Sequence, residues 1–286
     1  MQPVVARELW HRLEVVNAVT YFSPESRDAA ERIGLKGFWM GYFAFRAAPM
    51  GPVTPGVVEA TFFNFHPERV RRAIPDAWRF VDPRDVLSAR SEAAARALRR
   101  ILGDDAADQL ALMVLPVAQE AVALAGGDGR PLFAANREVD GLVDAVAAMW
   151  QAATTLREHR GDGHVALLTA AGLDGCEAHV LFAASEAAPV ELYLESRGWT
   201  AAEWAAASAR LADRGLLDGR GTISAAGQTL RDQIERATDR LAVTPYEQVG
   251  AYRVERLLSE VDPMIERIAN AGEISFPNPM GLPVRR

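Results

Sequence analysis

Apolar residues recur every three or four positions along most of the chain, which is the spacing of one face of an α-helix. The pattern predicts helices over residues 9–20, 37–48, 54–63, 83–102, 105–125, 140–157, 164–171 and 251–271. The glycine-rich stretches 126–129 and 161–163 are expected to be loops. The fold is therefore expected to be all-α and mainly helical, with one short exception near residue 220.

Residues 197–241 follow the order of elements in the second half of a winged helix. Thr200 and Glu203 are spaced as a capping box, so a helix is expected to start there. Gly219-Arg220-Gly221 lies between two short apolar arms, which predicts a β-hairpin over Leu217–Ser224, the wing. These elements indicate a C-terminal winged-helix module in an otherwise helical chain.

The chain is expected to have three parts. Residues 1–138 form a helical N-terminal half with a candidate ligand pocket, 139–250 form the winged-helix domain, and 251–286 form a helix and a proline-rich tail. Prolines prevent a helix in the tail, and its apolar residues favour docking along the body. Residues 41–51 resemble residues 163–172, about 120 positions further along. Internal duplication and chance likeness between alanine-rich helices both remain open explanations.

Composition limits the possible partners and location. The formal net charge of −7 over 286 residues disfavours a protein whose whole surface binds nucleic acid or an anionic membrane. The single cysteine, Cys176, excludes an internal disulfide and fits a reducing compartment. The N-terminal region lacks a long apolar segment, so neither a signal peptide nor a membrane span is expected. We therefore expect a cytoplasmic protein.

Several short strings together carry a resemblance to a known family. They are Tyr21-Phe22-Ser23-Pro24-Glu25, residues 34–43, Phe63-Asn64-Phe65, residues 157–164, Arg197-Gly198-Trp199 and residues 276–283. Over almost its whole length the chain resembles a group of actinobacterial helix-turn-helix family proteins that are distantly similar to MarR-type winged helices. The resemblance implies transcription regulation through the fold, and it carries over no catalytic residue.

Polar side chains among apolar and aromatic neighbours indicate where a small molecule could bind. Arg46 is the sharpest case, because a guanidinium beside Phe43 and Phe45 needs either an intramolecular carboxylate or a ligand anion. If duplicated halves face each other, a pocket at their seam joins Arg46 to the histidines of residues 157–164, and the tail could cover it. The candidate ligand-binding residues are Asn17, Tyr21, Trp39, Tyr42, Arg46, Asn64, His66, His159 and His164.

Other kinds of chemistry have less support in the sequence. His159, Asp162 and His164 could converge on a metal, but their spacing matches no metal motif, and Asp162 is expected to cap a helix that starts at His164. His66, which precedes a proline, has a helix cap as its alternative role. The chain contains no Gly-x-Ser-x-Gly elbow, P-loop or dinucleotide fingerprint. No metal is predicted, and the cofactor and any reaction are left open.

DNA binding has mixed support. The outward face of the helix after Thr200 offers alanines, whereas base readout uses Arg, Lys, Asn or Gln. The candidate DNA-binding residues are the nearby cations Arg210, Arg214 and Arg220. We interpret the chain as a small-molecule-responsive, MarR-like transcription regulator that could form a homodimer. The alternative is an enzyme or small-molecule-binding protein that keeps a degenerate winged helix as a scaffold without binding DNA.

Overall fold

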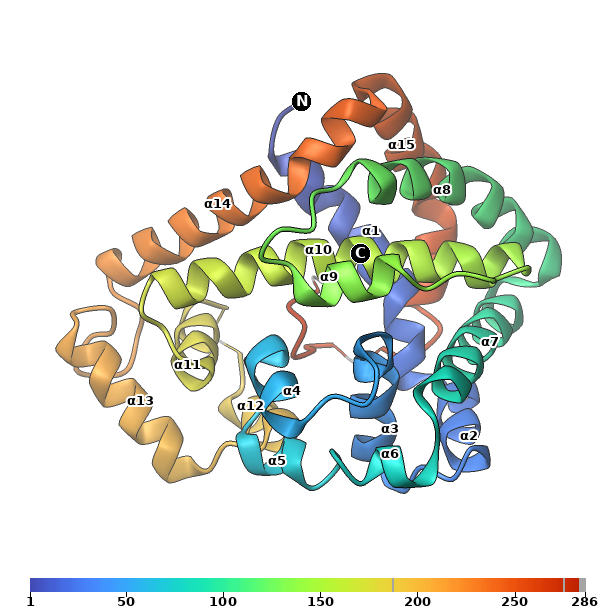
Figure 1. The fold of residues 1–286 in the computed structure, drawn as a ribbon. Coiled ribbons are helices and arrows are strands. Elements are labelled where there is room, and N and C mark those ends of the chain that lie inside the picture. Colours follow the sequence, from blue (N-terminus) through green and yellow to red (C-terminus); the bar gives the residue numbers. More distant parts are fainter. Residues whose placement is uncertain (187, 275, 283–286) are drawn as a thin grey trace.

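The computed structural model describes residues 1–186, 188–274 and 276–282. Helices dominate these ranges, so the all-α expectation is confirmed (Figure 1). In chain order they are α1 (Val4–Phe22), α2 (Pro24–Arg32), α3 (Gly37–Ala47), the 3-10 turn η1 (Ala48–Met50), α4 (Pro55–Phe62), α5 (Pro67–Arg71), α6 (Ala77–Phe80), α7 (Pro83–Leu102), α8 (Asp104–Leu124), α9 (Pro131–Arg137), α10 (Ala145–Ala170), α11 (Gly175–Glu186), α12 (Val190–Arg197), α13 (Ala201–Asp213), α14 (Ala225–Val249) and α15 (Ala251–Ala269).

Side-chain caps explain where several of these helices begin. The Ser23 hydroxyl accepts a hydrogen bond from the Ser26 N–H, and a proline occupies the first position of α2. The Asp144 carboxylate accepts from the first N–H groups of α10. The Ser224 hydroxyl accepts from the Gly227 N–H at the start of α14. Such caps satisfy N–H groups that have no partner within their own helix.

The loop expected at residues 161–163 does not exist, because α10 is one continuous helix of 26 residues. Gly163 lies within this helix at a place where a neighbouring side chain packs closely. A Cβ on Gly163 would lie 2.7 Å from the Arg130 guanidinium, and the missing side chain lets Arg130 donate to the His159 carbonyl. Asp162 therefore caps no helix at His164. Its carboxylate instead accepts from the Phe133 N–H in the first turn of α9, at 2.9 Å.

The predicted wing is wrong, because the described residues contain no β-strand. Leu217 and Ile223 form an isolated antiparallel bridge. The turn between them depends on Asp218, whose carboxylate accepts from the N–H groups of Arg220 and Thr222 at 2.8 and 2.9 Å. Leu217 is buried in the core, and arms this short leave no room for a ladder of paired residues. Within the part of the chain that the structure describes, the fold is all-α and lacks the hairpin expected for the winged-helix module.

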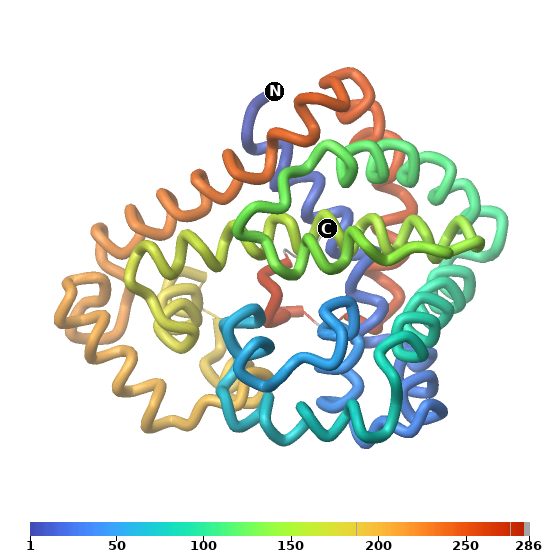
Figure 2. Tube along the Cα trace, viewed as in Figure 1, coloured from blue at the N-terminus to red at the C-terminus, as the bar shows by residue number. Residues whose placement is uncertain are grey.

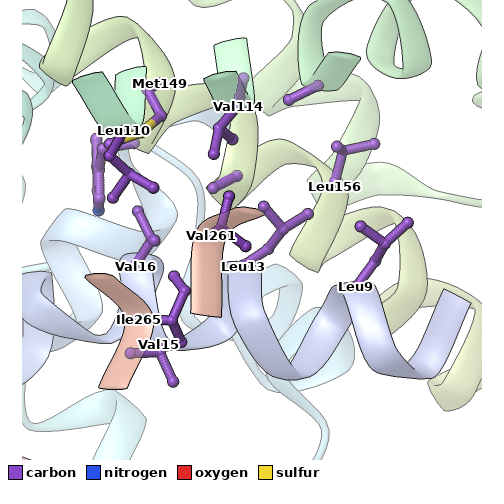
Figure 3. Packing of buried hydrophobic residues seen from close by; sticks show 14 of the residues in the cluster. Leu9, Leu13, Val15, Val16, Leu110, Val114, Met149, Leu156, Val261 and Ile265 are labelled. Atoms are coloured by element: carbon purple, nitrogen blue, oxygen red, sulfur yellow. The ribbon is translucent and has the colours of Figure 1, made fainter. Parts of the chain in front are cut away.

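The long helix α10 runs through the middle of the molecule, with α1, α8, α14 and α15 around it (Figures 1 and 2). Its first half joins these helices and α7 in the largest apolar cluster. At the centre of this cluster Leu13 and Val16 of α1 meet Leu110 of α8 and Val261 of α15 (Figure 3). Burial of apolar surface is the main favourable term in folding, so this cluster fixes the position of α10.

Two smaller apolar clusters flank the central one. One contains residues from the helices α2 through α7, packed around Phe43. The other joins the end of α10 to α11, α13 and residues 216–217. Among the described helices, α8 is long and apolar enough by length and composition to cross a membrane. In this fold its apolar residues line one side of the central cluster.

The segment after α15 returns to the middle of the molecule, as the dark red trace in Figure 2 shows. Ile274, Asn278 and Leu282 are buried, so the described residues of the tail pack against the rest of the molecule. The Asn278 side chain organises the turn, because its Oδ1 accepts from the N–H groups of Met280 and Leu282 at 3.1 Å. Residues 283–286 lie outside the described residues.

The structure places the two similar stretches on helices. Residues 41–47 belong to α3, and residues 163–170 form the last turns of α10. Duplication of the chain stays a prediction, as do the three parts with boundaries after residues 138 and 250.

Gly175 provides a test of how closely α11 approaches the N-terminal half. A Cβ at this position would lie well under 3.0 Å from the Phe63 carbonyl oxygen. Gly175→Ala should therefore lower the free energy of unfolding by about 1–3 kcal/mol through overpacking. In the control, Gly56→Ala, the new methyl group meets open space within α4. Urea unfolding that showed equal stability for both variants would contradict this close approach.

Candidate functional site

The helices α12 and α13 form a helix-turn-helix pair. α12 ends at Arg197, and Gly198 follows in the left-handed conformation, with a φ of 88°. The predicted capping box is confirmed: the Thr200 hydroxyl accepts from the Glu203 N–H, and the Glu203 carboxylate accepts from the Thr200 N–H. A three-residue turn containing glycine between two helices is the signature of this motif.

The two faces of α13 differ sharply in exposure. Ala207 and Leu211 are buried in the cluster that includes Cys176 and Val180 of α11. The opposite face exposes alanines, as the sequence predicts, at positions 202, 205, 206 and 209. α13 thus has one face fixed to the body and one face open to a partner.

Internal acceptors hold two of the three candidate DNA-binding arginines. Arg210 donates to Glu177 at 2.7 Å and to Asp174 at 2.6 Å. Arg214 donates to two carbonyl groups just after α10, at 2.7 and 2.8 Å. Arg220 is exposed at the turn after α13. Residues 174–224 contain eight acidic residues and four arginines, a formal charge of −4, so this unit offers little attraction for phosphates.

The segment around Asn64 and His66 anchors the helix-turn-helix pair to the N-terminal half. Trp199 donates its indole N–H to the Asn64 carbonyl at 3.1 Å, and the His66 N–H donates to the Arg197 carbonyl at 2.9 Å. His66 Nδ1 accepts from the Glu68 N–H, so the expected cap of α5 is confirmed. This contact places the ring proton on Nε2, which lies 2.8 Å from the Glu203 carboxylate.

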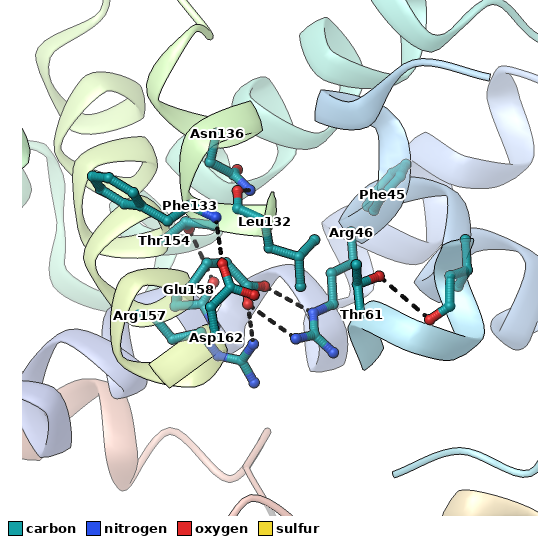
Figure 4. A network of polar contacts seen from close by, with 12 residues as sticks. Phe45, Arg46, Thr61, Leu132, Phe133, Asn136, Thr154, Arg157, Glu158 and Asp162 are labelled. Atoms are coloured by element: carbon teal, nitrogen blue, oxygen red, sulfur yellow. Dashed lines mark hydrogen bonds and ion pairs between the residues drawn. The ribbon is translucent and has the colours of Figure 1, made fainter. Parts of the chain in front are cut away.

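A second polar cluster lies between α1, α3 and α10 (Figure 4). Arg46 donates to both carboxylate oxygens of Glu158, from Nε at 2.8 Å and from Nη2 at 3.0 Å. Arg157 bridges Glu158 and Glu14, at 2.9 and 3.0 Å. Of the two alternatives for Arg46, the intramolecular carboxylate is therefore the one present in this structure.

The pKa values of the two carboxylates of this cluster shift in opposite directions. Burial alone would raise the pKa of Glu158, but the charges of Arg157 and Arg46 outweigh it and lower the pKa to about 2. Burial raises the pKa of Glu14, against the opposing charge of Arg157. Glu158 is thus the firmly ionised centre of the cluster.

Four other predicted ligand residues lie on α1 and α3, the helices that carry Glu14 and Arg46. The Tyr21 and Tyr42 ring centroids are 4.8 Å apart, and Trp39 lies 5.7 Å from Tyr42. Asn17 is fully buried, and its side-chain oxygen accepts from the Thr154 hydroxyl at 2.9 Å. The fold therefore places Asn17 and Tyr21 of α1 beside the helix that carries Trp39, Tyr42 and Arg46, and the Asn17 side chain is hydrogen-bonded within the protein.

The two histidines of α10 face other neighbours. The His159 ring contacts Phe133 at a centroid distance of 4.8 Å, and burial with the nearby Arg130 charge lowers its pKa to about 3. His164 Nδ1 lies 3.0 Å from the Thr238 hydroxyl on α14, and burial lowers its pKa. The proposed seam pocket is thus not assembled in this conformation. Among the described residues, no three His, Cys, Asp or Glu side chains are placed to hold a metal ion.

The cavities near these residues are small. One is lined by Tyr21, Arg46 and other residues of the polar cluster, and another by His159, Tyr246 and their neighbours on α1, α10 and α14. Each has a volume of about 10 Å³, which is room for about one water molecule. Sites for drug-sized ligands measure roughly 300–1,000 Å³. Ligand binding by the predicted residues stays a prediction and requires a change of conformation.

Sequence reasoning named Asn64 as a candidate ligand residue but missed the other members of a group of buried polar atoms beside the helix-turn-helix turn. Asn64 Oδ1, His179 Nε2, the Tyr193 hydroxyl and Arg197 Nε have no hydrogen-bond partner in the structure. His179 and Tyr193 sit among apolar residues of α11 and α12, where polar atoms are unexpected. That contrast is the signal that could have identified them.

Removing Arg46 tests its pairing with Glu158. Arg46→Ala should lower the free energy of unfolding by about 3–5 kcal/mol, because it leaves a buried carboxylate undercompensated. Arg256→Ala is the control, since Arg256 pairs with Glu260 on the exposed surface of α15. Urea unfolding measures both variants. An unchanged midpoint for Arg46→Ala would show that the pair contributes nothing to the fold.

Asp162 should make stability depend on pH. Burial raises the pKa of Asp162 to about 6, against the hydrogen bond from the Phe133 N–H. A folded-state pKa above the unfolded value stabilises the fold at low pH, and this contribution is lost as the pH rises through about 6. As the pH rises from 4.5 to 7.5, the free energy of unfolding of Asp162→Asn should therefore increase by about 2 kcal/mol relative to that of the wild type. A difference independent of pH in urea unfolding would contradict the raised pKa.

Comparison with known proteins agrees with the helix-turn-helix pair seen in the structure. The family model described as "Helix-turn-helix family" matches residues 6–275, which include α12, the turn and α13. No curated protein and no solved structure gives a significant match. On this match, which covers nearly its whole length, the chain belongs to the helix-turn-helix family.

Proposed function

We propose that the protein is a small-molecule-responsive transcription regulator of the helix-turn-helix type, in which α13 faces DNA. The exposure of α13 carries the proposal. One face is buried through Ala207 and Leu211, and the opposite face is open along the length of the helix. A recognition helix needs this arrangement, because it must be fixed to the body while it lies in the major groove.

The charge of the unit determines how it would bind DNA. Because residues 174–224 carry a formal charge of −4, non-specific attraction to phosphates is weak. Alanines can contact thymine methyl groups, and Arg220 is the exposed cation of the turn after α13. The proposed complex therefore depends mainly on close fit, and its affinity should fall only moderately as the salt concentration rises.

Arg220→Ala tests this proposal. A sequence selected from a random duplex pool should bind the wild type, and the variant should bind it several-fold more weakly, with a salt slope smaller by about 1. Fluorescence anisotropy at several salt concentrations measures both quantities. Arg256→Ala, on α15, should bind like the wild type. Equal binding by Arg220→Ala would move the interface away from this turn.

A second candidate function follows from the same charges. Arg210 and Arg214 are engaged by internal acceptors, and acidic residues outnumber arginines in the unit. These observations favour a small-molecule-binding protein or an enzyme that uses the helix-turn-helix pair as a scaffold. Failure to select any DNA sequence at low salt, in a protein that still binds a small molecule, would support this candidate.

A further inference from the structure

The unpartnered polar atoms beside the helix-turn-helix turn form one group. The His179 and Tyr193 ring centroids are 4.9 Å apart, and Arg197 lies close enough to lower the pKa of His179 together with burial. The Asn64 backbone forms a hydrogen bond with His179. Tyr193, His179 and Arg197 are only 1, 5 and 9% exposed. The group therefore gathers side chains from α11, α12 and the segment before α5.

Leaving such atoms unpaired is costly. A buried donor or acceptor without a partner destabilises the folded protein, and most buried polar side-chain atoms in proteins are paired. Here four such atoms occur together, on Asn64, His179, Tyr193 and Arg197. Four unpaired polar atoms in one place form an arrangement that a bound molecule with matching donors and acceptors would satisfy.

The C-terminal tail covers this group. Arg197 donates from Nη2 to the Pro279 carbonyl at 2.9 Å, while Arg197 Nε is left without an acceptor. Gly281 packs against the Phe182 ring, whose centroid is 6.3 Å from that of Tyr193. Nε and one Nη of an arginine can together bind both oxygens of a carboxylate. The tail therefore accepts from Nη2 alone, whereas a carboxylate would accept from both Nη2 and Nε of Arg197.

We propose that Asn64, His179, Tyr193 and Arg197 bind a small carboxylate with an apolar body and a hydroxyl group, which displaces residues 278–282 of the tail. The proposal deepens the proposed function by naming the class of molecule to which the protein responds.

Each part of this ligand matches a group in the site. Its carboxylate pairs with Arg197 and accepts from the unpartnered Tyr193 hydroxyl, and its hydroxyl donates to Asn64 Oδ1, which lacks a donor. Its apolar body lies against aromatic rings, since Tyr193 stacks on Trp204 at 5.9 Å and Phe65 lies under Arg197 at 4.6 Å. Burial keeps His179 neutral, so Arg197 supplies the positive charge.

The site is connected to the helix-turn-helix turn through Arg197. This residue ends α12, and its carbonyl accepts from the His66 N–H. A ligand that draws the guanidinium away from Pro279 therefore changes the contacts at the residue that precedes Gly198. Release of the tail and a shift of α12 relative to α13 follow from the same event.

Tyr193→Phe separates ligand binding from a structural role. Isothermal titration of the full chain with 3-phenyllactate should give binding that Tyr193→Phe weakens several-fold, up to about tenfold. The variant's thermal midpoint should stay equal or rise, because the hydroxyl has no partner without ligand. The matched control Tyr246→Phe alters a buried tyrosine at the other cavity and should leave the affinity unchanged. A lower midpoint with unchanged affinity would overturn the proposal.

Asn278→Ala tests whether residues 278–282 of the tail cover the binding site. Loss of the Asn278 side chain removes the contacts that shape residues 278–282. The state in which these residues are displaced from the site then becomes more populated, so 3-phenyllactate should bind several-fold more tightly. The uncharged amide of the ligand and inorganic phosphate should bind much more weakly than the acid. Absence of binding in this variant, or equal binding of acid and amide, would overturn the proposal. These titrations contain no DNA, so they can fail or succeed independently of the regulator function.

Discussion

The ion pair between Arg46 and Glu158 is the constraint on which the arrangement of α3 and α10 depends. Glu158 is fully buried, so α10 can carry this carboxylate only where cations meet it. Arg46 reaches it from α3, and Arg157 links it to Glu14 on α1. Three helices from distant parts of the sequence are thereby held in one register by four charged side chains.

This constraint also explains why the predicted pocket is closed. The aromatic residues around Arg46 form walls suited to a ligand, but the cation at their centre is already neutralised by Glu158. Beside the helix-turn-helix turn the balance is reversed, because Arg197 has a neutral carbonyl as its acceptor. A carboxylate forms a stronger hydrogen bond to arginine than a carbonyl does, so an incoming anion gains more at Arg197 than at Arg46.

Local patterns predicted much of the helical fold, and tertiary contacts account for the errors. The predicted helix over 83–102 coincides with α7, and the capping box at Thr200 starts α13. The glycines of 161–163 resemble a loop in sequence, but they lie within α10, where Arg130 packs on Gly163. The wing failed because Asp218 shapes that turn through its side chain. Glycine clusters thus have no fixed meaning until their neighbours are known.

The candidate sites were only partly predictable for a related reason. Arg46 could be identified as a cation in need of an anion, but its partner lies 112 residues away. Asn64 was named from the sequence, and His179 and Tyr193 stand out there only as polar residues in apolar helices; the fold is what places all three beside Arg197. Their shared property, a polar atom without a partner, belongs to the three-dimensional arrangement and has no counterpart in the linear pattern.

The alanine face of α13 has a consequence for recognition. Alanine has no side-chain rotamers to lose, so a partner that docks there meets a surface whose shape is already set. Discrimination between partners then depends on how well their contours follow a smooth helix, since methyl groups supply neither donors nor acceptors. Such a surface accepts partner surfaces of varied chemical composition, but only those whose curvature matches the helix.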